Sequence, residues 1–262
     1  MNASAAQTEV LLQWTYSPTE FFESSIEIAR ADYRVDIASG SISARFTASA
    51  FDADEQIKQR LHDSLFDRMR GMQLLTRKPF QLSKPRLTRI GPDGGCHIFL
   101  ELEGAVLKLS GGLVDITATN ASGKVVRDTK QERIEKKREL AELVAKYGSR
   151  DRVLDSMLKS YEISTLDPNN ELVHLYEVRE SISVAFGGES NVRATLGISH
   201  DDWSRLGLLC NNEPLRQGRH RGRNLGGLRD ATEAELSEAR NISRLIIEAY
   251  LQFLDNSGGV IK

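Results

Sequence analysis

Residues 125–148, VVRDTKQERIEKKRELAELVAKYG, mark the point at which the periodicity of the chain changes. Upstream, apolar and polar residues alternate, which is typical of strands that bury one face. Within the stretch, charges of both signs repeat up to Gly148, a usual helix stop, and predict a solvated helix or domain connector. Downstream, the apolar period stays close to 3.6. We therefore expect an α+β protein, with a strand-rich antiparallel domain over 1–126 and an all-α helical bundle over 127–262.

The strand prediction rests on short alternating runs separated by turn residues. The clearest runs lie at 10–16, 26–28, 33–37 and 42–46. Turn signals at Pro92–Gly95 and Gly111-Gly112 separate three further expected strands, at Cys96–Glu103, Ala105–Leu109 and Leu113–Thr119. One helix interrupts the strands, because apolar residues recur at spacings of three and four, with Asp52 or Asp54 as its cap: Ile57, Leu61, Leu65, Met69 and Met72.

The second half predicts a series of capped helices. The first covers 150–163, and the next runs from Asp167-Pro168 to Gly187-Gly188. Ser199 with Asp202, and Thr232 with Glu235, have the spacing of capping boxes. The last helix is expected to end near Asn256 and to bury an apolar face made of Leu236, Ile242, Leu245, Ile246, Ala249, Tyr250 and Phe253.

Composition and charge limit the class of protein. The 262 residues include 35 Lys and Arg against 37 Asp and Glu, a formal net charge of −2 that argues against a protein coating nucleic acid with charge over its whole surface. The two cysteines stand in unlike contexts, which favours a reducing compartment over a disulfide framework. Neither a secretory signal nor a run of ~18 apolar residues is present, so we expect a cytoplasmic protein without membrane association.

The most unusual stretch is 215–229, LRQGRHRGRNLGGLR, which has four glycines and no acidic residue. Its cationic candidates are Arg216, Arg219, Arg221, Arg223 and Arg229, together with His220. Arginine forks bind phosphate or carboxylate, and glycine lets backbone N–H groups approach an anion. Positive neighbours disfavour a protonated imidazole, which suits a general base. A structural interpretation stands beside this one: the arginines pair with acids of the helix that follows, Asp230, Glu233, Glu235 and Glu238.

The helical half resembles the HEPN domains of prokaryotic defence and toxin systems. The resemblance lies in a long helix, a shorter helical pair, and an Arg/His motif before a final apolar helix. It implies metal-independent RNA cleavage in a dimer, with His220 acting on the ribose 2′-hydroxyl and Arg216 stabilising charge on the phosphate. Arg216 and His220 have three residues between them where the family has four to six, although four positions on a helix place both on one face. Glu177 and Glu180 are potential polar partners of this site.

A second resemblance is to the helix-turn-helix motif, in residues 191–206, NVRATLGISHDDWSRL. Gly197 falls in the turn and Ser199 caps the second helix, as the motif requires. Arg193 replaces the usual small residue, and Asp201 and Asp202 would repel the phosphates beside a groove. We interpret the segment as two packed helices of the bundle, with DNA recognition as an alternative.

Other catalytic motifs are missing from the sequence. Gly123-Lys124 lacks the rest of a P-loop, no G-x-S-x-G occurs, and the five histidines have no metal-ligand spacing, so we expect no metal and no cofactor. The leading interpretation is a HEPN-like protein that acts on RNA or on nucleotide phosphate and binds RNA or another phosphate-bearing ligand through 215–229. The resemblance implies a homodimeric, metal-independent endoribonuclease of bacterial defence or stress. The alternatives are a non-catalytic nucleic-acid- or protein-binding scaffold or sensor, with a protein partner on the N-terminal domain, and a helix-turn-helix DNA-binding regulator.

Overall fold

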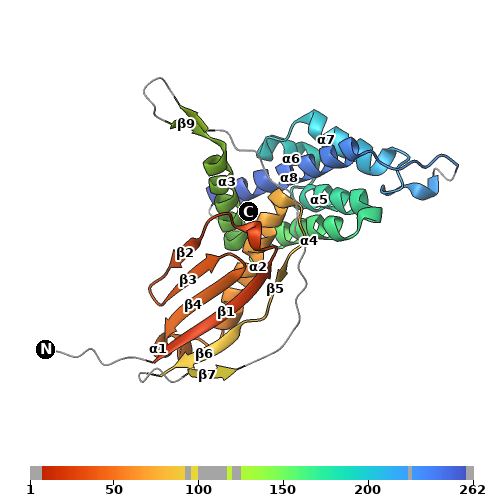
Figure 1. Ribbon diagram of the computed structural model, residues 1–262. Helices are drawn as coiled ribbons and strands as arrows, with labels where there is room; N and C mark the ends of the chain where they lie inside the picture. Colours follow the sequence, from red (N-terminus) through yellow and green to blue (C-terminus); the bar gives the residue numbers. More distant parts are fainter. Residues whose placement is uncertain (1–7, 92–95, 100–116, 120–124, 224–225, 258–262) are drawn as a thin grey trace. The chain divides into compact units, whose positions relative to one another are not determined.

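The computed structural model describes residues 8–91, 96–99, 117–119, 125–223 and 226–257, and it confirms the α+β class (Figure 1). The chain forms two compact units. The strand-rich unit comprises Met1–Met72 and Phe80–Glu139, and the helical unit comprises Gln73–Pro79 and Leu140–Lys262. This division differs from the expected boundary between residues 126 and 127, because helices 57–76 and 129–147 each contribute to both units.

An antiparallel sheet forms the strand-rich unit. Its strands have the order β2-β3-β4-β1-β6-β7, and β5 pairs with the end of β1. The predicted alternation is confirmed in β1, where Val10, Leu12, Trp14 and Tyr16 are all buried. The strands are β1 (Glu9–Ser17), β2 (Ile26–Ala29), β3 (Tyr33–Ala38), β4 (Ser41–Thr47), β5 (Gln81–Leu82), β6 (Arg86–Ile90) and β7 (Cys96–Phe99).

Helix α2 (Ile57–Thr76) packs on the buried face of this sheet, where the indole Nε1 of Trp14 donates to His62 Nδ1 at 3.2 Å. Of the two expected caps, Asp54 accepts a hydrogen bond from the Gln56 backbone, whereas Asp52 ends α1 (Ala48–Asp52). Neither α1 nor the 3₁₀ turn η1 (Thr19–Phe21) was expected from periodicity, because each is shorter than two helical turns.

The end of the first half is described only in part. A two-stranded sheet joins β8 (Thr117–Thr119) to β9 (Val125–Asp128), and α3 (Thr129–Tyr147) follows as predicted. β7 and β8 fall within the strands expected at Cys96–Glu103 and Leu113–Thr119. The remainder of those strands, the strand expected at Ala105–Leu109 and both expected turns, Pro92–Gly95 and Gly111-Gly112, lie outside the described residues.

The helical unit packs its helices around one apolar core that includes Trp203, Tyr161 and Tyr250. Two predicted caps are confirmed: Ser199 accepts from the Asp202 backbone, and Thr232 and Glu235 form a reciprocal capping box. Asp167 makes no side-chain cap, and the helix expected from Pro168 is instead a 3₁₀ turn followed by a helix that begins at Glu171. Leu245, expected inside, is 43% exposed, because it lies about two and a half turns from the buried Leu254 and therefore on the opposite side of the last helix. The elements are α4 (Arg152–Leu166), η2 (Pro168–Asn170), α5 (Glu171–Ala185), α6 (Glu189–Leu196), α7 (His200–Gly207), η3 (Leu208–Asn212), η4 (Arg221–Arg223) and α8 (Glu233–Asn256).

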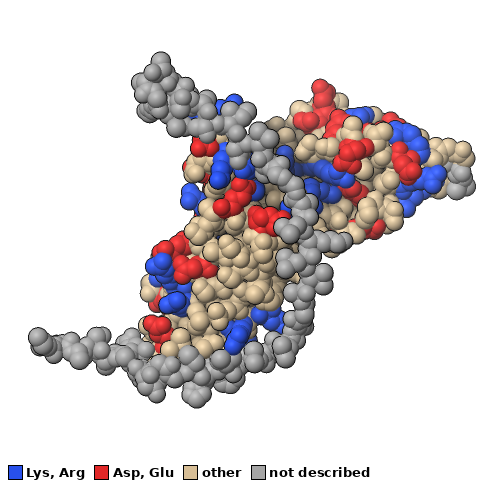
Figure 2. Space-filling view, viewed as in Figure 1, with Lys and Arg blue, Asp and Glu red and all other residues tan. Residues whose placement is uncertain are grey.

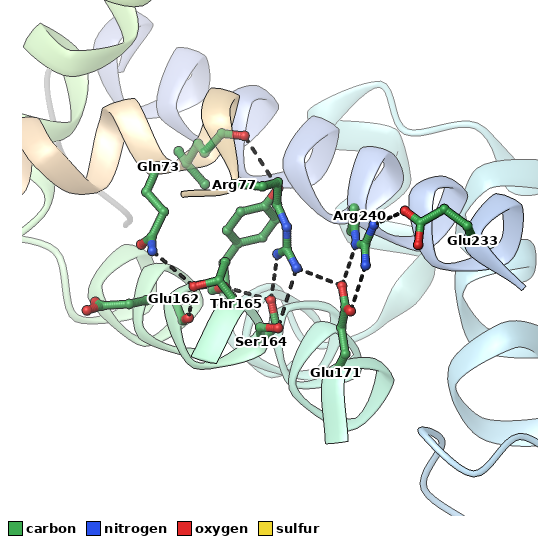
Figure 3. A network of polar contacts seen from close by, with 10 residues as sticks. Gln73, Arg77, Glu162, Ser164, Thr165, Glu171, Glu233 and Arg240 are labelled. Carbon is green, nitrogen blue, oxygen red and sulfur yellow. Dashed lines mark hydrogen bonds and ion pairs between the residues drawn. The ribbon is translucent and has the colours of Figure 1, made fainter. Parts of the chain in front are cut away.

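The segment Gln73–Pro79 is part of the helical unit through both apolar and polar contacts. Leu74 is buried in its core, and Gln73 donates to Thr165 Oγ1 at 3.1 Å. Arg77 donates to Ser164 Oγ at 2.8 Å and to Glu171 at 2.7 Å, and Arg240 binds the same carboxylate from the other side (Figure 3). The helical core therefore requires residues from before the expected boundary. None of the helices in the described part of the chain combines the length and apolar character needed to cross a membrane.

Candidate functional site at the basic loop

The basic loop, residues 215–229, is closed at its base by backbone pairing. Arg216 N donates to Arg229 O at 3.0 Å, and Arg229 N donates to Pro214 O at 3.1 Å. The side chain of Gln217 ties the loop to the start of α8 by accepting from Ala231 N at 3.0 Å. Residues 224–225 lie outside the described part of the loop. The described part is thus held at several points by hydrogen bonds.

The basic loop packs against η3, a single π-helical turn. Its defining bond runs from Glu213 N to Leu208 O at 2.9 Å, five positions apart. Two carbonyl groups of this turn bind the loop: Cys210 O accepts from Arg219 N at 3.0 Å, and Asn211 O accepts from His220 Nδ1 at 3.0 Å. Such π turns recur at functional sites in proteins.

The contact with Asn211 determines which ring nitrogen of His220 carries the proton. A carbonyl oxygen can only accept, so Nδ1 must be the donor. In the neutral ring the lone pair is then on Nε2, for which the described residues offer no hydrogen-bond partner. The half-buried imidazole is therefore arranged to accept a proton at Nε2.

The expected helical relationship between Arg216 and His220 is not observed. Residues 216–220 form turns and bends rather than a helix, so a separation of four positions does not place the two side chains on one helix face. The physical reason is local, since Pro214 ends the preceding helical turn and Leu215 pairs with Arg229.

Arg219 is held by residues of α5. Its guanidinium lies 4.4 Å from the ring centroid of Tyr176 and donates to Glu180 at 2.8 Å. Glu180 raises the pKa of Arg219 further above its usual value. Of the two acidic residues expected as polar partners of the site, Glu180 thus pairs with Arg219, whereas Glu177 contacts Ser160 and His174. The cation stabilises the loop, by stacking on an aromatic ring and by ion pairing.

Arg221 and Arg229 also have partners within the chain. Arg221 Nε donates to Gly218 O at 2.9 Å, and its NH2 group binds the side-chain oxygen of Asn170. Arg229 forms a bidentate pair with Glu235 at 2.6 and 2.8 Å, which lowers the pKa of that carboxyl to about 2. The structural interpretation, arginine pairing with the following acidic helix, is confirmed for Arg229.

Arg216 and Arg223 differ from these three arginines. The Arg216 side chain is 63% exposed, and its nearest carboxylate oxygen, on Asp230, is 3.8 Å away. Arg223 is exposed, and no hydrogen bond or ion pair of its side chain is found among the described residues, although its backbone N donates to His220 O at 3.1 Å. On the face drawn in Figure 2, basic and acidic side chains of the helical unit are interspersed. Two arginines of the loop are consequently available to an anionic ligand.

Sequence reasoning missed the aromatic residues beneath the loop. Arg179 lies 4.5 Å from the Trp203 ring centroid and 5.4 Å from that of Tyr176, so the stack continues from Arg219 to α7. Gly207 of α7 lies against this guanidinium, since a Cβ there would be 3.5 Å from Arg179 Cζ, an ordinary van der Waals contact. The only sequence signal was the helical spacing of Tyr176, Arg179 and Glu180, which is common on exposed helices.

The predicted pair of helices at 191–206 is present. Gly197 adopts the left-handed conformation, with φ of 68°, between α6 and α7. Arg193 pairs with Glu189 at 3.1 Å, and Asp201 is fully exposed at the start of α7. An acidic start on the second helix disfavours contact with DNA phosphates.

Neither the buried cysteine nor the potential metal ligands form a further site among the described residues. Cys210 is free and buried, and burial raises the pKa of its thiol, so it is an inert core residue. Within the described ranges, no three His, Cys, Asp or Glu side chains are grouped so that they could hold a metal ion.

Comparison of the chain with protein-family models, with curated proteins and with solved structures finds no match.

Proposed function

We propose that the basic loop is a site for RNA or another phosphate-bearing ligand and that His220 is its proton-transfer group in metal-independent RNA cleavage by a HEPN-like protein of bacterial defence or stress. The observation that carries this proposal is the bond from His220 Nδ1 to Asn211 O, which leaves Nε2 as the basic nitrogen. The choice of RNA, and of a homodimer, rests on the resemblance of the helical half to HEPN domains.

The chemistry assigns different tasks to the loop residues. His220 Nε2 would take the proton of a ribose 2′-hydroxyl as that oxygen attacks the adjacent phosphorus. The bond from phosphorus to the 5′-oxygen of the next nucleotide would break, leaving a 2′,3′-cyclic phosphate, and the departing 5′-oxygen would take a proton from the imidazolium or from water. Arg216 and Arg223, whose side chains reach solvent, would stabilise the charge that develops on the phosphate. Arg219, Arg221 and Arg229 would keep the loop in place. The six cationic candidates of the sequence thus divide into one base, two ligand-binding arginines and three loop-holding arginines.

The test is cleavage of an end-labelled RNA of mixed sequence in EDTA, with binding measured by fluorescence anisotropy. We expect cleavage by the wild-type protein and its loss in His220→Ala, with binding retained. His200→Ala is the matched control, since His200 is an exposed histidine outside the loop. Cuts that persist in His220→Ala would refute the assignment of the base.

A non-catalytic binding scaffold is the second candidate, favoured by the carboxylates that already neutralise Arg219 and Arg229. Salt dependence tests how many arginines reach phosphate. Two contacts on single-stranded RNA predict a slope of log K against log salt of about −1.4, whereas contacts from all five arginines of the loop would give about −3.5. Binding with the shallow slope and no cleavage would support the scaffold, and a protein partner would then be sought on the strand-rich unit.

A further inference from the structure

We infer that Gly218 and the π turn Leu208–Asn212 are positioning elements that fix the tautomer of His220. This inference rests on the proposed function for its biological role, but the geometry it describes can be tested without RNA. Backbone hydrogen bonds hold the chain on either side of His220 in the sequence. The preceding residue, Arg219, donates its N–H to Cys210 O, and the carbonyl of His220 accepts from Arg223 N.

The sequence explains why the π turn has carbonyl groups available. In a continuing α-helix, Cys210 O would accept from the backbone N–H of residue 214, but that residue is proline and has none. Asn211 O would accept from Leu215 N, which instead donates to Glu213 O at 2.8 Å. Both carbonyls therefore face the loop without a helical partner, and the loop supplies Arg219 N and His220 Nδ1.

Gly218 permits the close approach of the loop to these carbonyls. A Cβ at this buried position would lie 3.2 Å from Cys210 O and 3.3 Å from Leu215 O, closer than an ordinary van der Waals contact. Because both atoms belong to the backbone, an alanine would require the loop and the turn to separate by a few tenths of an ångström. Gly222 offers the matched comparison, since a Cβ there meets nothing within 4 Å. Neither glycine has a positive φ, so alanine is compatible with both backbones.

The consequence for His220 follows from the nature of its partner. A hydroxyl or amide side chain can donate or accept, and it would tolerate either tautomer of the ring, whereas a carbonyl permits only the tautomer with the proton on Nδ1. The acceptor is also a backbone atom, so it stays in place through side-chain substitutions nearby. Gly218 is accordingly a positioning residue, which acts on His220 through the distance between loop and turn.

The experiment is a long-range ¹H–¹⁵N correlation spectrum of the full-length protein labelled at histidine, recorded where the imidazoles are neutral. The five histidines are distinguished by the loss of one set of signals in His220→Gln. We expect His220 to show a protonated Nδ1 and an unprotonated Nε2. Gly218→Ala should lose this pattern in favour of a mixture of tautomers, and Gly222→Ala should keep it.

Two results would overturn the inference: a wild-type His220 protonated on Nε2, or a Gly218→Ala spectrum identical to that of the wild type. If Gly218→Ala does not fold, the tautomer of His220 in the wild-type protein is the test of the inference.

RNA cleavage separates this inference from the proposed function. A protein with the Nδ1–H tautomer that never cuts RNA contradicts only the function, while His220-dependent cutting with the other tautomer contradicts only the positioning. Where cleavage occurs, Gly218→Ala should slow it by roughly tenfold or more.

Discussion

The buried carboxylate of Glu171 gives the sharpest prediction for stability. Its side chain is 3% exposed, and it accepts one hydrogen bond from Arg77 and two from Arg240 (Figure 3). Arg240→Met keeps most of the apolar stem of the side chain but removes two of the three charged bonds. We expect this substitution to lower the free energy of unfolding of the helical unit.

The size of this loss in the free energy of unfolding depends on the buried carboxylate that Arg240→Met leaves with fewer partners. Breaking a buried ion pair by removing one partner costs about 3–5 kcal/mol, because the other charge stays desolvated. Arg77 remains beside Glu171, which places the expected loss at the lower end, about 3 kcal/mol. The contact of Arg240 with Glu233 adds little, since Glu233 is exposed.

The assay is urea denaturation followed by tryptophan fluorescence in a Trp14→Phe background, in which buried Trp203 is the only tryptophan and reports on the helical unit. Arg244→Met, on the same helix, is the control. Its pair with Glu248 spans 3.4 Å, and the two side chains are 32% and 23% exposed, so it is expected to contribute about 1 kcal/mol, less than the contacts of Arg240 with the nearly buried Glu171. The double substitution Glu171→Met/Arg240→Met should cost less than Arg240→Met alone, because no desolvated carboxylate is left. Equal losses for Arg240→Met and Arg244→Met, or additive losses in the double variant, would refute the reasoning.

Three further predictions concern single groups. Arg133 holds the pKa of Glu23 at about 2 against a usual 4.5, so the contribution of Glu23 to stability is complete above pH 4.5 and is lost as the pH falls toward 2. Urea denaturation should accordingly show that wild type and Glu23→Gln differ at pH 7 and converge as the pH approaches 2, and a constant difference would contradict the assignment. In a Cys96→Ser background, Cys210 should react with a thiol reagent only after denaturant is added, because its thiol is buried and the pKa of the thiol is raised. Rapid labelling of the native protein would contradict this burial. Thr232→Ala removes half of the capping box of α8 and should cost about 1 kcal/mol in urea denaturation, with no loss expected if the cap is frayed in solution.

The features that the sequence predicted well are those set by residues close together in the chain. The alternation in 10–16 and the helical spacing in 57–72 both identified the side chains that are buried. The caps at Ser199 and Thr232 were also predicted, because a cap and its partner are three residues apart. In the same way, the pairing of Arg229 with the following acidic helix spans only six positions.

The division into units shows the limit of local patterns. The change of period near residue 125 is real, since β9 gives way to α3 there. However, Leu74 and Arg77 belong to the helical unit through contacts with residues about ninety positions away, such as Ser164 and Glu171. Nothing in the periodicity of α2 distinguishes its last turn from the turns before it. An independent helical fragment of 127–262 would lack both contacts and would leave Glu171 with Arg240 alone.

The basic loop shows the same limit for a site. Its composition, five arginines and no acid, predicts a strongly positive surface. The structure places Glu180 against Arg219 and Asn170 against Arg221, and both partners come from elements some forty to fifty positions earlier. Charge counted along the chain therefore overstates the charge that a ligand meets. The hydrogen bond of His220 could not be predicted, for a different reason. Its acceptor is a backbone carbonyl, which every residue has, so the type of side chain at position 211 does not reveal it. What the sequence does contain is the cause of that carbonyl's availability, a proline three positions after Asn211 that ends the helical turn and a glycine at 218 that admits the loop.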